Sequence, residues 1–292
     1  MLTFALTILA LLTLATLLVR YRLSVNTSPE LLNNQKRIRT WWVICLICIP
    51  TFYIGGWALS LLIYALIYLA FYELSRLQDL RINFVRFLLL TLVIVSYDFV
   101  VGRFPDQANV FFVIPVLILF ASLFFSHSTG TRALFVLLFC IASLHSLQLI
   151  SQLSNQYAYD SGLIILFLVF ITSANDIFQY LCGKLLGHKQ LAPGLSPNKT
   201  IEGALGGIFF TGLIFALVLP QLVAITWFEA IIIGVLVSML GILGDLYFSF
   251  FKRLVNAKDS GTLMPGHGGL LDRIDSLTLT APGFGFCLYV VT

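Results

Sequence analysis

Long apolar stretches separated by short polar segments run along almost the whole chain. Between these polar landmarks, the pattern predicts ten hydrophobic helices, at 2–19, 40–54, 57–74, 84–101, 109–127, 132–151, 161–182, 204–226, 228–249 and 276–291. A helix needs about 20 mostly apolar residues to cross the hydrocarbon core of a bilayer. Because lipid cannot satisfy unpaired backbone groups, we expect an all-α, polytopic integral membrane protein with about 8–10 transmembrane helices.

Two of these predicted helices are weaker than the others. The uncharged stretch from Thr40 to Tyr72 is too long for one crossing, and Gly55-Gly56 interrupts it. We therefore expect two helices joined by a tight turn, with a short first helix. The last helix is also short and contains Pro282, which predicts a kink or partial insertion.

Charge is scarce in this chain and lies mostly on one side of the predicted membrane. Among 292 residues, 10% are charged and 59% are hydrophobic, which excludes a soluble enzyme with a single core and a disordered regulator. With the N-terminus outside, the ten helices place 16 of the 17 basic residues on the inner side and leave only Arg103 outside. Merging the two helices around Gly55 would abolish this asymmetry, so the positive-inside rule favours the split.

Two inner segments break the hydrophobic pattern with unusual chemistry. The first runs from Asn175-Asp176 to the run Ser196-Pro-Asn-Lys-Thr-Ile-Glu-Gly203, and the second runs from Gly244-Asp245 to Asp275. A carboxylate such as Asp245 on an apolar helix is costly unless it is paired, hydrated or bound to metal. The polar residues therefore predict a site at the membrane boundary.

The second segment has the residue types of a metal–polyphosphate site. Asp272 and Asp275 are three residues apart and would share one face of a helix. Carboxylates at such a boundary suit Mg²⁺, which usually binds through a few carboxylates and substrate phosphates. Cations that phosphoryl oxygens need are supplied by Lys252, Arg253, Lys258 and Arg273. Glycines that allow close backbone approach are Gly266, Gly268 and Gly269.

Each of these features alone has a simpler explanation. Basic residues beside a membrane helix are usually topology anchors or contacts to anionic lipid, as Lys252 and Arg253 could be. A lone His267 is more often a turn residue than a base, and Ser196-Pro197 is a typical helix start. The dense combination within one short stretch favours a functional site.

The second segment resembles, nearly position for position, the signature of the phosphatidate cytidylyltransferases, also called CDP-diglyceride synthetases. The matching residues are Ser249-Phe-Phe-Lys252-Arg253, Lys258-Asp259-Ser260-Gly261 and Pro265-Gly-His267-Gly-Gly269-Leu-Leu-Asp272-Arg273-Ile-Asp275. Residues 196–203 resemble a second motif of that family and Gly244-Asp245 a third. The resemblance implies that CTP and phosphatidate react to CDP-diacylglycerol and pyrophosphate with Mg²⁺, in a homodimer whose active site opens toward the cytoplasm.

The resemblance also implies residue roles by matched position. The implied metal ligands are Asp245, Asp272 and Asp275, of which the first two are catalytic, and the other implied catalytic residues are Lys252, Arg273 and His267. The implied substrate-binding residues are Asp176, Ser196, Lys199, Thr200, Glu202, Ser249, Arg253, Lys258, Asp259, Gly268 and Gly269. A second, monovalent cation such as K⁺ stays open beside Mg²⁺. Residues 1–160 would form N-terminal transmembrane helices, and 161–292 the catalytic region.

Two departures from the family pattern keep alternatives open. Phe178 follows Asp176 closely where small residues are common, and Phe248 stands where an acidic residue often precedes the matched serine. Both are expected near a lipid-facing wall, which suggests a divergent paralogue or another lipid phosphate as acceptor. A transporter with Asp176 and Asp245 on an ion path, and a non-catalytic scaffold, are the other hypotheses. We expect the lipid bilayer as partner, no nucleic acid, and the inner membrane if the cell is bacterial.

Overall fold

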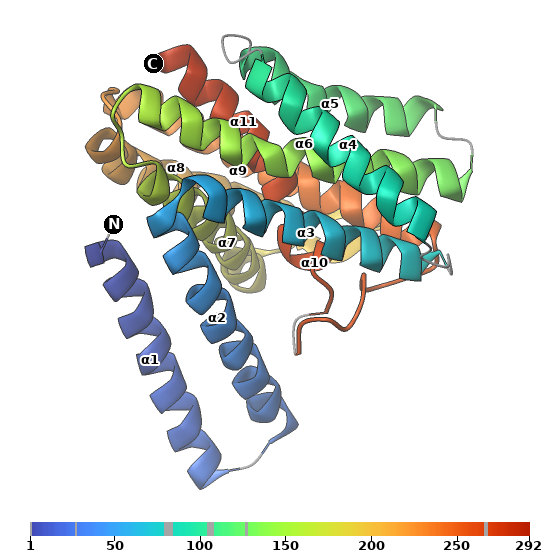
Figure 1. The fold of residues 1–292 in the computed structure, drawn as a ribbon. Coiled ribbons are helices and arrows are strands. Elements are labelled where there is room, and N and C mark those ends of the chain that lie inside the picture. The colour runs from blue at the N-terminus through green and yellow to red at the C-terminus, as the bar shows by residue number, and fades with distance from the viewer. Residues whose placement is uncertain (1, 27, 79–83, 104–107, 126–127, 266–267) are drawn as a thin grey trace.

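The computed structural model describes residues 2–26, 28–78, 84–103, 108–125, 128–265 and 268–292 (Figure 1). The first part comprises α1 (Leu2–Val25), α2 (Pro29–Ile54), α3 (Gly56–Leu77), α4 (Phe84–Arg103), α5 (Ala108–Phe125), α6 (Thr129–Gln156) and α7 (Ser161–Leu186). The second comprises β1 (Gln190–Ala192), β2 (Ser196–Thr200), α8 (Ile201–Leu222), α9 (Trp227–Leu254), α10 (Leu271–Ile274) and α11 (Leu277–Val291). Within the described residues, nine segments are long and apolar enough to cross a membrane, which confirms the polytopic, essentially all-α prediction.

The predicted break between the second and third helices is present at Gly55. This residue has φ +64°, a left-handed conformation that glycine adopts without steric cost, and it ends α2. The expectation of a short helix before the break was wrong, because α2 begins at Pro29 and the apolar segment Leu31–Ile54 has 24 residues. Ser28 caps α2 by accepting the Leu31 N–H at 3.3 Å. The basic residues before Thr40 therefore lie on a helix and not in a loop.

The predicted helix start at Ser196-Pro197 was also wrong. These residues belong to β2, which pairs antiparallel with β1, and Thr200 caps α8 by accepting the Gly203 N–H at 3.0 Å. The eighth helix consequently spans Ile201–Leu222, three residues earlier than predicted at its start and four residues earlier at its end. Residues 126–127, the predicted end of the fifth helix, lie outside the described residues.

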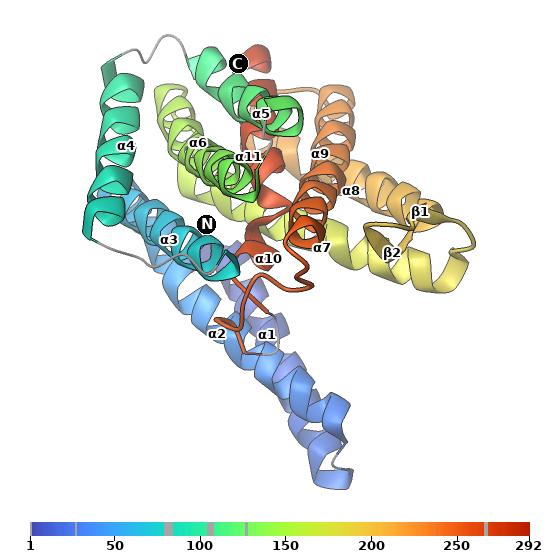
Figure 2. The ribbon, with the colours of Figure 1, turned by 90° about the vertical axis from the view of Figure 1, so that its right-hand side faces the viewer.

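The helices pack around a core to which α6, α7, α9 and α11 contribute fully buried side chains. Figures 1 and 2 show the α1–α2 hairpin projecting away from the other helices, and Figure 2 shows β1 and β2 at the ends of α7 and α8. Phe248 on α9 is only 2% exposed and packs near Phe139 of α6, with 6.2 Å between ring centroids. Phe248 was expected near a lipid-facing wall, but its side chain packs inside the helix bundle. Phe178 is half-buried and stacks on Phe210 of α8 at 5.2 Å.

Candidate active site

We refer to residues 255–270, which join α9 to α10, as the signature loop. Figure 2 shows this loop and α10 beside α3 and α9. Its backbone closes on itself where the Met264 N–H donates to the Gly268 carbonyl at 2.9 Å. Gly266 and His267 lie outside the described residues, so the roles expected of them stay predictions.

Asp272 on α10 is the most heavily hydrogen-bonded of the predicted acids. Its Oδ1 pairs with Lys252 Nζ at 2.6 Å, and its Oδ2 accepts the Ser260 N–H at 2.8 Å and the Gly269 N–H at 3.0 Å. The Ser260 hydroxyl also lies 3.0 Å from Oδ2. Gly268 has φ +85°, and a Cβ there would lie 2.8 Å from Oδ2, so the backbone can approach this carboxylate only because the residue is glycine. The signature loop is thus folded around the Asp272 side chain.

A second ion pair joins the β-hairpin to α9. Lys199 of β2 pairs with Asp245, and both side chains are mostly buried. The Ser249 hydroxyl, one turn further along α9, donates to Asp245 Oδ1 at 3.3 Å. Arg253 donates from Nε to the Leu195 carbonyl at 3.4 Å in the turn of the hairpin. These contacts hold the hairpin, and the Lys199 cation, over the end of α9.

Three acids gather where α7, α9 and the start of α11 meet. Asp275 is buried, accepts the Ser276 N–H at 2.8 Å and interacts electrostatically with Asp245 and Asp176. The Ser276 hydroxyl lies 3.4 Å from both carboxylate oxygens of Asp176, and Arg273 also interacts electrostatically with that acid. Like charges this close need a counter-charge, which here comes from basic side chains.

The chemistry of these side chains fits a divalent cation, although the described residues form no ready-made ligand set. The predicted ligands are divided: Asp272 is paired with Lys252, whereas Asp245 is paired with Lys199 and clusters with Asp275. In the described part of the chain, no three acidic, histidine or cysteine side chains are arranged to share one ion. Carboxylates gathered at a membrane boundary are nevertheless the donors that Mg²⁺ prefers. The lysine ammonium groups supply the positive charge in this arrangement.

The residues expected to bind substrate do not all converge. Thr200 and Glu202 form hydrogen bonds with backbone N–H groups near the start of α8. Thr200 accepts the Gly203 N–H, and Glu202 accepts the Lys189 N–H at 3.3 Å. Lys258 and Asp259 are exposed on the signature loop. The proposed contacts of these four side chains with substrate stay predictions.

Glu73 on α3 is a site residue that the sequence-based reasoning missed. Its side chain is 2% exposed and accepts the Leu270 N–H at 2.6 Å, the Leu271 N–H at 2.9 Å and the Ser260 hydroxyl at 3.0 Å. The signal that could have found it is the one that drew attention to Asp245: an acid inside an otherwise apolar predicted helix, here 57–74.

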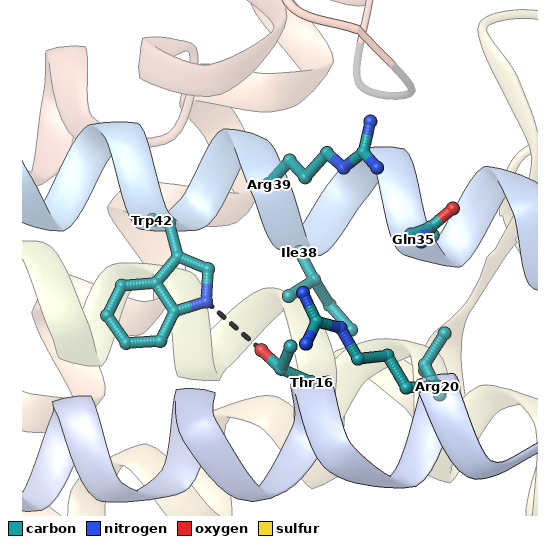
Figure 3. A pocket seen from close by; sticks show the side chains of 7 residues that line it. Thr16, Arg20, Gln35, Ile38, Arg39 and Trp42 are labelled. Atoms are coloured by element: carbon teal, nitrogen blue, oxygen red, sulfur yellow. Dashed lines mark hydrogen bonds between the residues drawn. The ribbon is translucent and has the colours of Figure 1, made fainter.

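Two cavities lie apart from these ion pairs. One has a volume of about 130 Å³ and lies between α1 and α2, where Trp42 Nε1 donates to Thr16 Oγ1 at 3.0 Å (Figure 3). Its lining is Thr16, Val19, Arg20, Gln35, Ile38, Arg39 and Trp42. The other, about 250 Å³, is mainly apolar and lies between α3, α4 and α6. The described residues that line them include no member of either lysine–carboxylate pair.

One lysine–carboxylate pair joins β2 to α9 and the other joins α9 to α10, beside a glycine-rich loop. Paired cations of this kind next to membrane helices are suited to phosphate chemistry. The model of the cytidylyltransferase family matches residues 35–291, and the chain belongs to this family. It is therefore a CTP-dependent nucleotidyltransferase, which favours the enzyme over the transporter and scaffold hypotheses.

Similar proteins include two named phosphatidate cytidylyltransferases and one uncharacterized protein. The uncharacterized protein, Escherichia coli YnbB, is 33% identical over 97% of this chain and 98% of its own length. The phosphatidate cytidylyltransferase of Staphylococcus saprophyticus is 32% identical over 82% of this chain and 93% of its own length. That of Helicobacter pylori is 40% identical over 43% of this chain and 47% of its own length. These likenesses confirm the family resemblance and indicate a multi-pass membrane enzyme of phospholipid synthesis.

Proposed function

We propose that this enzyme transfers the cytidylyl group of CTP to phosphatidate, with CDP-diacylglycerol and pyrophosphate as products. The observation that carries the proposal is the pairing of Lys252 of α9 with Asp272 of α10 and of Lys199 of β2 with Asp245 of α9. Two lysines already held by carboxylates can exchange these partners for phosphate oxygens, which gives a cationic surface for a triphosphate and a lipid phosphate. The names of the relatives from Staphylococcus saprophyticus and Helicobacter pylori support phosphatidate as the acceptor.

The reaction requires one bond to form and one to break at the α-phosphorus of CTP. A phosphate oxygen of phosphatidate attacks that phosphorus, and the bond to the β-phosphate breaks so that pyrophosphate leaves with the electron pair. The acceptor oxygen is already anionic at neutral pH, so no strong general base is required. The protein therefore contributes mainly by positioning and by neutralising charge.

Named side chains can carry these two tasks. Lys252, paired with Asp272, and Lys199, paired with Asp245, would neutralise phosphate oxygens. Arg273, on the exposed face of α10, and Arg253, beside the hairpin, extend the cationic surface. Water is restricted around Lys252, whose side chain is only 12% exposed, so its charge acts in a less polar medium than bulk water.

Mg²⁺ is the proposed cofactor; the clustered acids Asp245 and Asp275 would hold it, and Asp272 would join them once Lys252 turns to a substrate phosphate. When bound, it supplies positive charge that stabilises the leaving pyrophosphate. A second, monovalent ion such as K⁺ is an additional expectation. The donor chemistry of these side chains supports the assignment.

We also propose that the active site faces the cytoplasm of a multi-pass protein that works as a homodimer, in the inner membrane if the cell is bacterial. The inward location of 16 of the 17 basic residues in the predicted topology supports this orientation. The dimer rests on the family resemblance.

The decisive experiment supplies purified protein with labelled CTP, Mg²⁺ and a panel of lipid phosphates that includes phosphatidate and isoprenoid phosphates. We expect pyrophosphate release and a labelled liponucleotide with phosphatidate as the best acceptor. Preference for another lipid phosphate would overturn the acceptor but keep the reaction class. No pyrophosphate release with any acceptor would overturn the proposed function.

A further inference from the structure

Glu73 is the one buried acid from the first half of the chain that contacts the signature loop among the described residues. It lies on α3, near the end of that helix, and its contacts are 187 to 198 residues away in sequence. Burial of a carboxylate at 2% exposure is costly unless donors surround it. Glu73 has three donors, two of them backbone N–H groups, so its acceptor oxygens are already occupied within the protein.

The partners of Glu73 are the same groups that hold Asp272. The Ser260 hydroxyl lies 3.0 Å from both Glu73 Oε2 and Asp272 Oδ2, and with one proton it can donate to only one of them at a time. The Leu270 and Leu271 N–H groups bound by Glu73 directly follow Gly269, whose own N–H is bound by Asp272. Consecutive backbone amides are thus divided between the two carboxylates.

The close approach of the loop to Glu73 shows how little freedom this arrangement leaves. A Cβ at Gly269 would lie 2.0 Å from the Ser260 hydroxyl oxygen and 2.6 Å from Glu73 Oε2. A Cβ at Gly261 would lie 3.2 Å from Glu73 Oε1. The backbone of the signature loop therefore comes close to the Glu73 carboxylate at two places, Gly261 and Gly269.

We propose that Glu73 is a positioning residue: its carboxylate holds Ser260, Leu270 and Leu271 in place and thereby fixes Asp272 and Lys252 where the substrate phosphates bind. This inference rests on the proposed function. Its consequence is that the segment 161–292 does not contain everything its site needs, because α3 supplies the anchor of the loop. Glu73 acts through Asp272 and touches no substrate.

The test compares Glu73→Gln with Glu73→Asp in the full-length, detergent-purified protein. Glutamine has the same size, but its NH₂ group faces a backbone N–H, so one of the Leu270 and Leu271 amides loses its acceptor. Aspartate keeps the charge and both acceptors on a shorter stem. The matched control is Asp98→Asn, which removes another intramembrane carboxylate that contacts α3, through Tyr64, but not the signature loop.

Three readouts are measured: hydrogen exchange at the Leu270 and Leu271 amides, kcat and KM for CTP and phosphatidate, and the thermal midpoint. For Glu73→Gln we expect faster exchange at the amide that loses its acceptor. We also expect a kcat about 100-fold lower, because small misplacements of catalytic groups cost this much, with KM changed far less. Glu73→Asp should recover part of the lost kcat. Asp98→Asn should lower the thermal midpoint with kcat nearly unchanged.

An unchanged kcat in Glu73→Gln, with or without faster amide exchange, would overturn the inference. So would a loss of activity in Asp98→Asn of the same size, since that would trace the effect to general destabilisation. Failure of the proposed function has a different signature, because the wild-type protein itself would then release no pyrophosphate. An active wild type with an equally active Glu73→Gln would contradict only the positioning role.

Discussion

Two carboxylates link α3 to other parts of the chain, and they are satisfied in different ways: Glu73 of α3 is buried, whereas Asp98 of α4 is partly exposed. Asp98 of α4 accepts a hydrogen bond from the Tyr64 hydroxyl and lies 3.0 Å from His145 Nε2 of α6. Its partners are side chains on regular helices. Glu73, in contrast, binds mainly backbone N–H groups where the signature loop ends and α10 begins.

The difference indicates what each carboxylate does. Asp98 joins α4 to α3 and α6, and Tyr68 adds a hydroxyl contact to Thr91 of α4 at 2.7 Å. Few side chains of α4 are buried, so these polar contacts contribute much of its attachment. Glu73 instead gives a loop its shape, and loops positioned by a rigid scaffold commonly carry function. A buried acid that binds main-chain donors therefore points to the site, whereas an acid that binds side chains on helices points to helix packing.

The largest expected effect is that of Asp272→Asn. The amide removes the charge that faces Lys252 and presents an NH₂ group to the donors around it, so we expect cytidylyl transfer to fall at least about 100-fold. Pyrophosphate release with CTP and phosphatidate measures this, and a normal elution profile in detergent shows that the protein is folded. Activity near the wild-type level would contradict the place given to Asp272.

Gly269→Ala tests the role of the loop that Glu73 binds. The variant adds only a methyl group and changes no charge. The added Cβ would overlap the Ser260 hydroxyl oxygen at 2.0 Å, so the loop must move away from Glu73 and Asp272. We expect a loss of activity of about 10- to 100-fold, since displacements near 1 Å have that cost. Gly102→Ala on α4 is the matched control, because nothing lies within 4 Å of the added Cβ. Equal activities of the two variants would show that the loop tolerates displacement.

The sequence predicted the helices well because membrane crossing imposes a length and an apolar composition on each one. It erred where polar residues continue a helix beyond the membrane, as in α2, and where Ser196-Pro197 form a strand of a hairpin. Local preference favours a helix start there, but pairing with β1 decides the conformation. Such pairing is a tertiary effect that the local pattern does not contain.

The candidate site was only partly accessible to the same reasoning. The motif located Asp272 and Lys252 on neighbouring segments, and these residues form a pair. It did not reveal Glu73, which is 187 residues from Ser260, or the Thr40 hydroxyl, which donates to the Pro265 carbonyl at 2.9 Å. Contacts at that separation depend on how helices assemble, and a common residue such as threonine carries no signal of them.

Asp98→Asn tests the helix-packing side of the comparison. The substitution weakens the contacts with Tyr64 and His145, and loss of hydrogen bonds to a charged group costs about 1.5–3 kcal/mol. We expect a lower thermal midpoint in detergent. The kcat per folded molecule should stay within about twofold of the wild type, because no group that positions substrate has moved. A large fall in kcat with an unchanged midpoint would erase the distinction between the two carboxylates.

The smallest expected effect is that of Tyr64→Phe, which removes one donor from Asp98 and leaves His145 in place. Asp98 is 24% exposed, so water or the remaining partner can satisfy part of its need. Hydrogen bonds between membrane helices contribute about 0.6 kcal/mol on average, and a loss of this size should lower the thermal midpoint only slightly.

Combining Tyr64→Phe with Asp98→Asn sharpens the comparison: if the two side chains act as one contact, the double variant should unfold at nearly the same temperature as Asp98→Asn alone. Fully additive shifts would mean that the Tyr64 hydroxyl contributes through some partner other than Asp98.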